Sequence, residues 1–501
     1  MKRIAPVLLL LTGTILAGSA HAGAPILLPG NLVVSVEGNG VQGATSGPYA
    51  DNQAAPLTLF QFSHTGTSSA SYVNAVVLPQ TATGANHAIS GEYGSSSEGG
   101  LQLTADGKHL IIMGYGVNAA AFNANPTAFG TTTTGSSKST ALGQSSSIAC
   151  GAGCTAVPRV VAVVNADGTV DTTTALSGVF NGNNPRSVAS VNGSSFYVSG
   201  QGTGSDATGG VFLAQRGATT ATEITGLDAT GSTVSQDTRF VVIHNGQLYV
   251  SVDSKGGSNA ARSFIGTVGN GLPTGLTNPT GAGPDPDSTN GPIMLQGFGN
   301  SPGGTGKLTL TADQTNGVNK VGKQINLSPE DYFFANDDTL YVADSGDGKQ
   351  TSASNSLGDG GLQKWSLIGG VWTLDYTLAD GLNLVANTAS SGTTGLLGLT
   401  GEVIGDEVEL FATNFTAGDT DPTFLYGITD DLDSLTRPVD SHGNQTEIFT
   451  QLAAAPVDSN FKGVSFAPSA GVPEPATWAL MISGFSLVGG LLRRRARSAL
   501  A

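Results

Sequence analysis

The stretch Phe240-Val241-Val242-Ile243-His244-Asn245-Gly246, followed by Leu248-Tyr249-Val250, contains the pattern that decides the fold. An apolar strand, a tight Asn-Gly or Asp-Gly turn and a second strand rich in Tyr, Phe and Val are the strongest short-range signal for a β-hairpin. The pattern recurs, with clear or degenerate turns, at Leu101–Gly107 before Leu110–Ile112, Ser187–Gly193 before Phe196–Val198, Tyr332–Asp338 before Leu340–Val342, and Leu399–Asp406 before Val408–Phe411. These repeats predict an all-β body.

A Gly-rich loop follows each hairpin and leads to a third strand and usually a fourth. Third strands are expected at Val160–Val164, Val211–Ala214, Ser263–Val268, Leu362–Leu367 and Phe424–Ile428. Fourth strands are expected at Val170–Leu176, Glu223–Leu227, Val371–Leu378 and Glu447–Leu452, and at Lys307–Thr311 for the copy that contains Tyr249. Four antiparallel strands per unit is the sheet of a β-propeller blade.

The two ends of the body complement each other. The N-terminal region contains three predicted strands but no first strand of a blade: Leu32–Val36, Leu57–Phe62 and Val73–Leu78. The C-terminal region contains only a predicted first strand, Phe461–Ala467, without the three strands that would follow it. Together they would complete one more blade and close the ring, which leaves few exposed sheet edges. The sequence therefore predicts a six-bladed β-propeller over residues 23–468. Seven blades is the alternative, because the long irregular segment Gly269–Lys323 could hold another.

The composition is that of an acidic but folded chain. The formal net charge is −16 while charged residues make up only 12% and apolar residues 39%, so the chain can build a core and is not a disordered polyanion. An acidic body repels nucleic acid, which is therefore not an expected partner. The two cysteines, Cys150 and Cys154, are expected to form a local disulfide, since two thiolates alone make a poor zinc site.

The N-terminus has the three parts of a secretory signal peptide. Lys2 and Arg3 form a positive region, Ile4–Ala17 is apolar, and Ala20-His21-Ala22 is a small-x-small cleavage site. We expect signal peptidase to remove residues 1–22, so that the mature chain begins near Gly23.

The C-terminal segment, residues 469–501, predicts a membrane span. Val472-Pro473-Glu474-Pro475 precede an uncharged run of 17 residues, Ala476–Leu492, and the run ends at Arg493, Arg494, Arg495 and Arg497. As a helix the run would be about 26 Å long, enough for a thin bilayer of about 27 Å. The arginines would hold that end in the cytoplasm. An ordinary tail anchor is one interpretation.

The same three parts, in the same order, resemble the PEP-CTERM sorting signal, also known as an ice-binding-protein C-terminal domain. The resemblance covers residues 471–501 only. It implies an exported protein of a Gram-negative bacterium that makes an extracellular polysaccharide matrix. It also implies processing by an exosortase near Pro473-Glu474-Pro475. The protein would first be anchored on the periplasmic side of the membrane and would then lie at the cell surface or in the matrix. The body resembles no specific family.

A candidate site follows from the propeller geometry, because propellers bind ligands where their innermost strands begin. The polar residues at these positions are Glu98, Asn184, Arg186, Asp237, Arg239, Glu330, Asp331, Asn460 and Lys462. Such a ring could hold a divalent metal such as Ca²⁺ through oxygen ligands, or a sugar. Architecturally it resembles six-bladed lactonases of the gluconolactonase type. The structural alternative is that these residues cap turns and form salt bridges. Three short acidic turns could each be either a calcium site or an ordinary solvent-exposed turn: Asp344–Asp347, Asp285–Asp287 and Asp419–Asp421.

Two functions are compatible with these features. The first is that of a non-catalytic surface or matrix protein, whose partners could include an exopolysaccharide. The second is a secreted hydrolase that acts on a lactone, ester or sugar with a divalent metal in the central funnel. The sequence contains neither a Gly-x-Ser-x-Gly elbow on a strand–helix turn nor a His-Glu-x-x-His motif, and its residues identify no cofactor.

Overall fold

The computed structural model describes residues 25–41, 49–131, 140–203, 208–225, 237–252, 263–277, 292–298, 307–310, 324–348 and 360–469. Within these ranges the chain consists mainly of antiparallel β-strands, and its helical elements are short. The prediction of an all-β body is confirmed.

The hairpin of the opening motif forms as predicted, with β13 (Thr238–His244) paired to β14 (Gln247–Val252). Asn245 and Gly246 have φ angles of 46° and 75°, the left-handed pair that a two-residue hairpin turn requires and that Asn-Gly supplies. The remaining predicted hairpins also form: β5 (Leu101–Leu103) with β6 (His109–Tyr115), β9 (Pro185–Ala189) with β10 (Ser195–Gly200), β19 (Pro329–Phe334) with β20 (Thr339–Asp344), and β23 (Thr393–Ile404) with β24 (Glu407–Thr416).

Third and fourth strands extend each hairpin into an antiparallel sheet. The third strands are β7 (Arg159–Asn165), β11 (Gly210–Gln215), β15 (Phe264–Thr267), β21 (Gly361–Ile368) and β25 (Phe424–Asp431). The fourth strands are β8 (Val170–Leu176), β12 (Thr222–Glu223), β16 (Ile293–Met294), β22 (Val371–Leu378) and β26 (Thr450–Ala454).

One predicted strand has a different partner. The fourth strand beside β15 is β16, whereas the predicted segment Lys307–Thr311 forms β17 (Lys307–Thr309) and pairs with β18 (Gln324–Asn326). β16 pairs at Thr267↔Ile293, and Leu295 N–H donates to Ile265 O at 2.9 Å. The edge of β15 is therefore already occupied. In the described part of the segment 269–323, where a seventh blade could have lain, the strands are β16 and β17.

The two ends of the body share one sheet. β1 (Leu32–Gly38) lies between β27 (Ser459–Phe466) and β2 (Ala54–Thr65), and β3 (Ser69–Val77) pairs with β2. The register places Val34 opposite Val464. The predicted pairing of the C-terminal strand with the N-terminal strands is confirmed, and we call β27, β1, β2 and β3 the terminal sheet.

A short strand that the sequence did not predict joins the terminal sheet to the next one. β4 (Ser90–Glu92) pairs with residues 54–56 of β2 and meets β6 at Ser90↔Tyr115, so the two sheets form one nine-stranded sheet. Gly and Glu are depleted in strands, and β4 is only three residues long, which explains why pattern alone missed it.

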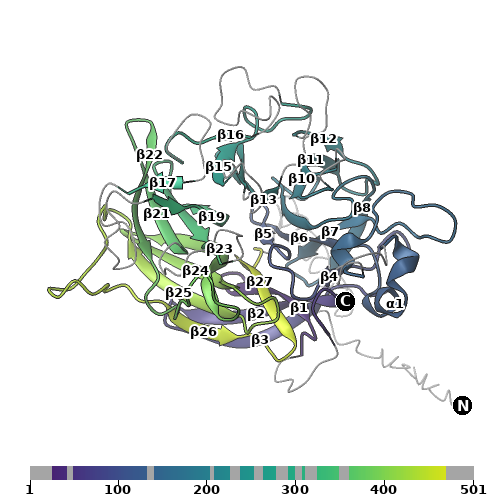
Figure 1. Cartoon of the computed structure of the whole chain (residues 1–501), viewed down its shortest axis with the longest axis horizontal. Coiled ribbons are helices and arrows are strands. Elements are labelled where there is room, and N and C mark those ends of the chain that lie inside the picture. Colours follow the sequence, from purple (N-terminus) through teal and green to yellow (C-terminus); the bar gives the residue numbers. More distant parts are fainter. Residues whose placement is uncertain are drawn as a thin grey trace, which may run out of the picture.

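Figure 1 shows the sheets arranged around a common centre, with β5, β13, β19, β23 and β27 near it. We call β5, β9, β13, β19, β23 and β27 the first strands, because each begins one group of four strands. They contact one another in succession: β5 with β9, β9 with β13, β13 with β19, β19 with β23, β23 with β27, and β27 with β5. Their starting ends therefore come together, although they lie far apart in the sequence.

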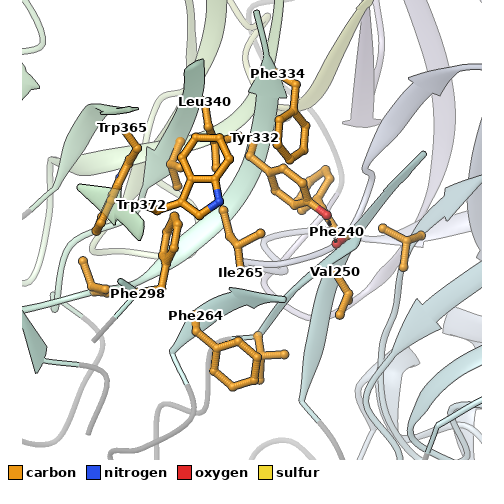
Figure 2. Close-up of a cluster of buried hydrophobic side chains, with 14 of the residues drawn as sticks. Phe240, Val250, Phe264, Ile265, Phe298, Tyr332, Phe334, Leu340, Trp365 and Trp372 are labelled. Atoms are coloured by element: carbon orange, nitrogen blue, oxygen red, sulfur yellow. Dashed lines mark hydrogen bonds between the residues drawn. The ribbon is translucent and has the colours of Figure 1, made fainter. Parts of the chain in front are cut away.

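Apolar layers fill the space between neighbouring sheets. In the layer between β13–β16 and β19–β22, the ring of Trp365 stacks on Phe298 with centroids 4.1 Å apart (Figure 2). The other face of the β19–β22 sheet, with Tyr341 and Tyr376, packs against β23–β26. Another layer joins β23–β26 to the terminal sheet and includes Phe411 and Phe461.

The predicted disulfide is present, between Cys150 and Cys154 with a Cα–Cα distance of 5.5 Å. The long loop that contains it also holds a helix that the sequence did not predict, α1 (Ala119–Ala124), capped by the side chain of Asn118. Among the described residues no helix combines the length and the apolar character needed to cross a bilayer. The signal peptide, the motif Val472–Pro475, the span Ala476–Leu492 and the arginines at 493–497 lie outside the described residues.

Candidate functional site

The structure brings together most of the polar residues predicted at the strand entries. We call Glu98, Asn184, Arg186, Asp237, Arg239 and Glu330 the charged ring, since they lie at or just before the starts of β5, β9, β13 and β19. Asn184 Nδ2 donates to Glu98 Oε1, and Arg186 Nη1 donates to Asp237 Oδ1. Neighbouring members of the ring therefore contact one another directly across sheet boundaries.

The part of the ring that contains both arginines alternates guanidinium and carboxylate groups. Arg239 lies between two carboxylates: its Nε is 3.6 Å from Asp237 Oδ1, and its Nη1 is 3.6 Å from Glu330 Oε2. Arg186 also donates to the carbonyl of Thr238 at 3.1 Å. Both arginine side chains are only 4% exposed and that of Glu330 is 0% exposed. These contacts agree with the structural alternative, in which the charges join first strands to one another.

A second group of carboxyls, Glu37, Glu92 and Glu98, lies beside the ring. We call these three residues the glutamate cluster; all are buried. Glu98 accepts hydrogen bonds from the Tyr115 hydroxyl and from the backbone N–H of Glu92. Burial raises the pKa of Glu98 to about 7, although these hydrogen bonds act in the opposite direction. Glu98 can therefore gain or lose a proton near neutral pH.

The other two glutamates are even more reluctant to ionise. Burial raises the pKa of Glu37 to about 8, against the attraction of Lys462, whose Nζ is 3.8 Å from Glu37 Oε2. Burial and the nearby charge of Glu98 raise the pKa of Glu92 well above its usual range, while the Gly143 N–H bond to Glu92 lowers it. At neutral pH the cluster therefore holds protons that exposed glutamates would release.

Sequence reasoning missed Glu37 and Glu92. Glu37 directly follows Val36 in a strand whose residues are all buried. In a chain with only 12% charged residues, a carboxylate in such a strand was a usable signal for a buried acid. Glu92 lies on β4, the strand that the sequence did not predict, so its position depended on the tertiary structure.

The remaining predicted positions tie neighbouring strands together. Asp331 accepts from the backbone N–H groups of Leu399 at 3.0 Å and Tyr332 at 2.9 Å, and burial raises its pKa to about 8. Asn460 accepts from the N–H of Gly94 at 3.2 Å. Lys462 donates to the carbonyl of Ser95. Asp331 thus joins β19 to β23, whereas Asn460 and Lys462 join β27 to the loop before β5.

The short acidic turns make hydrogen bonds inside the protein. Asp344 accepts from the N–H groups of Ser328 and Gly346 at 2.9 and 2.8 Å, and Asp421 accepts from Gly392 and Gly418 at 2.8 and 2.9 Å. Asp285 and Asp287 lie outside the described residues. In the part of the chain that the structure describes, no three His, Cys, Asp or Glu side chains are grouped so that they could hold a metal ion.

No protein-family model matches the sequence, and no curated protein matches it. Solved structures similar to the chain include TolB from Acinetobacter baumannii, with a TM-score of 0.32, 8% identity, and coverage of 86% of this chain and 67% of that one. A mutant of the Synechocystis apocarotenoid oxygenase has a TM-score of 0.32 and 10% identity, and covers 89% and 94%. The Trypanosoma rangeli sialidase has a TM-score of 0.32 and 11% identity, covering 78% of this chain and 53% of that chain. Likeness at this level carries no argument about substrate or partner.

Proposed function

We propose that this chain is an exported bacterial surface protein with a non-catalytic structural or binding role. Its body is a six-bladed β-propeller, and its C-terminal segment is a sorting signal that an exosortase reads. The observation that carries the proposal is the route of β27. Near the start of this strand, Lys462 donates to the carbonyl of Ser95, whose hydroxyl accepts from Asn184 of the charged ring. Just beyond its end, Ser469 donates to Gly107 in the turn between β5 and β6, a few residues before Val472-Pro473-Glu474-Pro475.

The propeller is supported by the pairing of strands and the contacts between sheets. Five hairpins carry a third and a fourth strand, and the terminal sheet adds one more group of four. The first strands of these groups contact one another in a closed succession, with β27 between β23 and β5. A body of this kind uses its C-terminal strand as part of the fold rather than as a loose connection.

The position of the last described residues supports the role of the tail. Ala467 N–H donates to the Asn31 carbonyl at 2.8 Å, and Ser469 N–H donates to the Gly107 carbonyl, also at 2.8 Å. Gly107 is in the turn between β5 and β6, at the opposite end of β27 from Asn460. A body tethered through this point would carry the charged ring on the side that faces away from the membrane.

A non-catalytic role is supported by the partners of the ring residues. Arg186 and Arg239 are paired with Asp237 and Glu330 of the same ring, so its charges already stabilise the meeting of the first strands. A hydrolase would need some of these groups available to a metal or a substrate.

The experiment compares the wild-type chain with the variant Pro473→Ala/Glu474→Ala/Pro475→Ala in a host that contains an exosortase. We expect wild type outside the cell without its arginines, and the triple variant at full length in the membrane. Thr477→Ala is the matched control, because it changes the apolar span but not the motif, and it should be released like wild type. Equal retention of wild type and triple variant, both with the tail intact, would reduce the segment to a plain anchor.

The hydrolase alternative has its own measurement on the same material. One tightly bound divalent metal per released chain, lost on Glu98→Gln, would favour a metal-dependent hydrolase and overturn the non-catalytic role. We expect no such stoichiometric metal.

A further inference from the structure

A buried amine and a buried carboxyl lie in contact at the interface between two sheets, away from the charged ring. Lys364 is in β21 and Asp430 is in β25, and Nζ of Lys364 is 3.1 Å from Oδ2 of Asp430. Their side chains are 1% and 0% exposed. Successive residues of a strand face opposite sides of a sheet. Accordingly Trp365 packs toward β13–β16 (Figure 2) and Lys364 faces β23–β26.

Two tyrosines enclose the pair. In the sheet register Lys364 lies between Tyr341 of β20 and Tyr376 of β22, and its Nζ is 5.7 and 5.4 Å from the centres of their rings. The Tyr376 hydroxyl lies 2.8 Å from Oδ1 of Asp430, and the Tyr341 hydroxyl donates to Oδ2 at 2.5 Å. Burial raises the pKa of both phenols, so they remain protonated and act as hydrogen-bond donors to the carboxyl group.

A third ionisable group meets the carboxyl of Asp430. Glu447 precedes β26, and its carboxyl lies near enough to that of Asp430 for the two groups to interact. Its Oε1 accepts from the Asp431 N–H at 3.3 Å, and among the described residues its Oε2 has no hydrogen-bond partner. Burial, followed by the contact with Asp430, raises the pKa of Glu447 to about 9. Glu447 therefore carries a proton at neutral pH, next to the carboxyl of Asp430.

This arrangement has the parts that condensation of an amine with a carboxylic acid requires. The two reactants are held in contact, which removes the entropic barrier to their meeting. The tyrosine hydroxyls point at the oxygens on which negative charge would develop. Glu447 is a proton donor and acceptor in contact with the same carboxyl.

We propose that Lys364 and Asp430 form an intramolecular amide bond between Nζ and Cγ, with Glu447 as the proton relay. The ammonium of Lys364 passes one proton to Asp430, which leaves a neutral amine and a neutral acid. The amine lone pair forms the N–C bond at Cγ. Glu447 takes a second proton from the nitrogen and gives a proton to the departing oxygen, the C–O bond breaks, and one water leaves. No oxidation or co-reactant is involved, and the protons balance.

The product would join the β19–β22 sheet covalently to the β23–β26 sheet. An ion pair at the same place would break whenever the two sheets separate, whereas an amide would hold them together after all other contacts are lost. The inference does not depend on the sorting signal or on any role of the charged ring.

The test uses the full chain, denatured, digested with chymotrypsin and analysed by mass spectrometry. Trypsin is unsuitable because the sequence offers it no site between Lys364 and Asp430. We expect one branched peptide in which the segment containing Lys364 is linked to the segment containing Asp430, at the sum of their masses less one water. Acetylation in denaturant should leave Lys364 unmodified in that peptide. Separate peptides in wild type, with Lys364 acetylated, would overturn the proposal. Loss of a water without the branched peptide, as from a succinimide at an Asp-Gly turn, would also overturn it.

Variants separate the reaction from the fold. Lys364→Arg retains the positive charge beside Asp430 but cannot form the amide, and Glu447→Gln retains a side chain of the same shape but cannot relay the proton. Both should give only unlinked peptides. Glu402→Gln changes an exposed glutamate on β23 and should give the same branched peptide as wild type. Full linkage in Glu447→Gln would refute the role of Glu447, and because wild type is assayed in the same way, a variant that fails to fold leaves the main result intact.

Discussion

The pairing of β27 with β1 makes a quantitative prediction about two valines that are far apart in the sequence. Val34 and Val464 are directly opposite in the antiparallel register and belong to the same buried cluster. Their exposed fractions are 0% and 1%. Opposed residues on one face of a sheet have Cβ atoms about 5 Å apart, so each side chain forms part of the wall around the other.

The size of the effect follows from the atoms removed. Val→Ala removes the equivalent of two buried methylenes, which at about 0.8 kcal/mol each is about 1.6 kcal/mol, and the cavity raises this to about 2 kcal/mol. Each single variant, Val34→Ala and Val464→Ala, should therefore lower the free energy of unfolding by about 2 kcal/mol. In the double variant the two cavities merge, so the loss should fall short of the sum by about 0.5–1 kcal/mol.

The assay is urea unfolding of the body from Gly23 to Ser469, followed by tryptophan fluorescence. The control cycle combines Val34→Ala with Val198→Ala, because Val198 is equally buried but belongs to a different apolar cluster. That pair should be additive within about 0.3–0.5 kcal/mol. If the Val34 and Val464 variants are as additive as the control pair, the two ends do not pair as described, and the proposed closure of the body by β27 is wrong.

The other predictions concern charge and covalent structure. The folded state holds the pKa of Glu37 at about 8, above its ordinary value of 4.5, so the stability from its protonation is present at low pH and lost as pH rises toward 8. Glu37→Gln should flatten the fall in melting temperature between pH 5 and pH 8, and equal slopes would contradict this. Arg239→Met should destabilise the body by about 3 kcal/mol in urea unfolding, because Glu330 stays buried without that guanidinium, and adding Glu330→Gln should recover part of the loss. Cys150→Ala/Cys154→Ala should cost about 2 kcal/mol or less, since the disulfide closes a very short loop, and a larger fall would show that it constrains more than that loop.

Local pattern was sufficient for most of the strands and for much of their order. A hairpin is specified by residues next to one another, so Asn245-Gly246 with apolar strands on both sides predicted β13 and β14 without further information. The spacing of Cys150 and Cys154 was sufficient for the disulfide in the same way. The pairing of β27 with β1 was predictable for a different reason: strands that lack partners at the two ends of a repeat can complete one sheet.

The routing of the long insertion was not predictable from pattern. Lys307–Thr309 has the alternation of a strand, but the edge of β15 was already paired with β16, so this segment found its partner at Gln324–Asn326. Which of two short strands reaches an open edge depends on the path of the chain between them. Strand periodicity contains no information about that path.

For the two sites, the sequence predicted the position of each residue along its strand but not which residues meet across sheets. The sequence alone placed Glu98, Asp237 and Glu330 at strand entries, since these positions are counted from neighbouring turns. The meeting of Lys364, Asp430 and Glu447 required the tertiary structure. Alternation along a strand determines which face of its sheet a side chain occupies, but the angle and distance at which two sheets pack determine which residue it meets. Contacts between sheets are therefore properties of the assembled body, and the chemistry proposed for Lys364 and Asp430 exists only there.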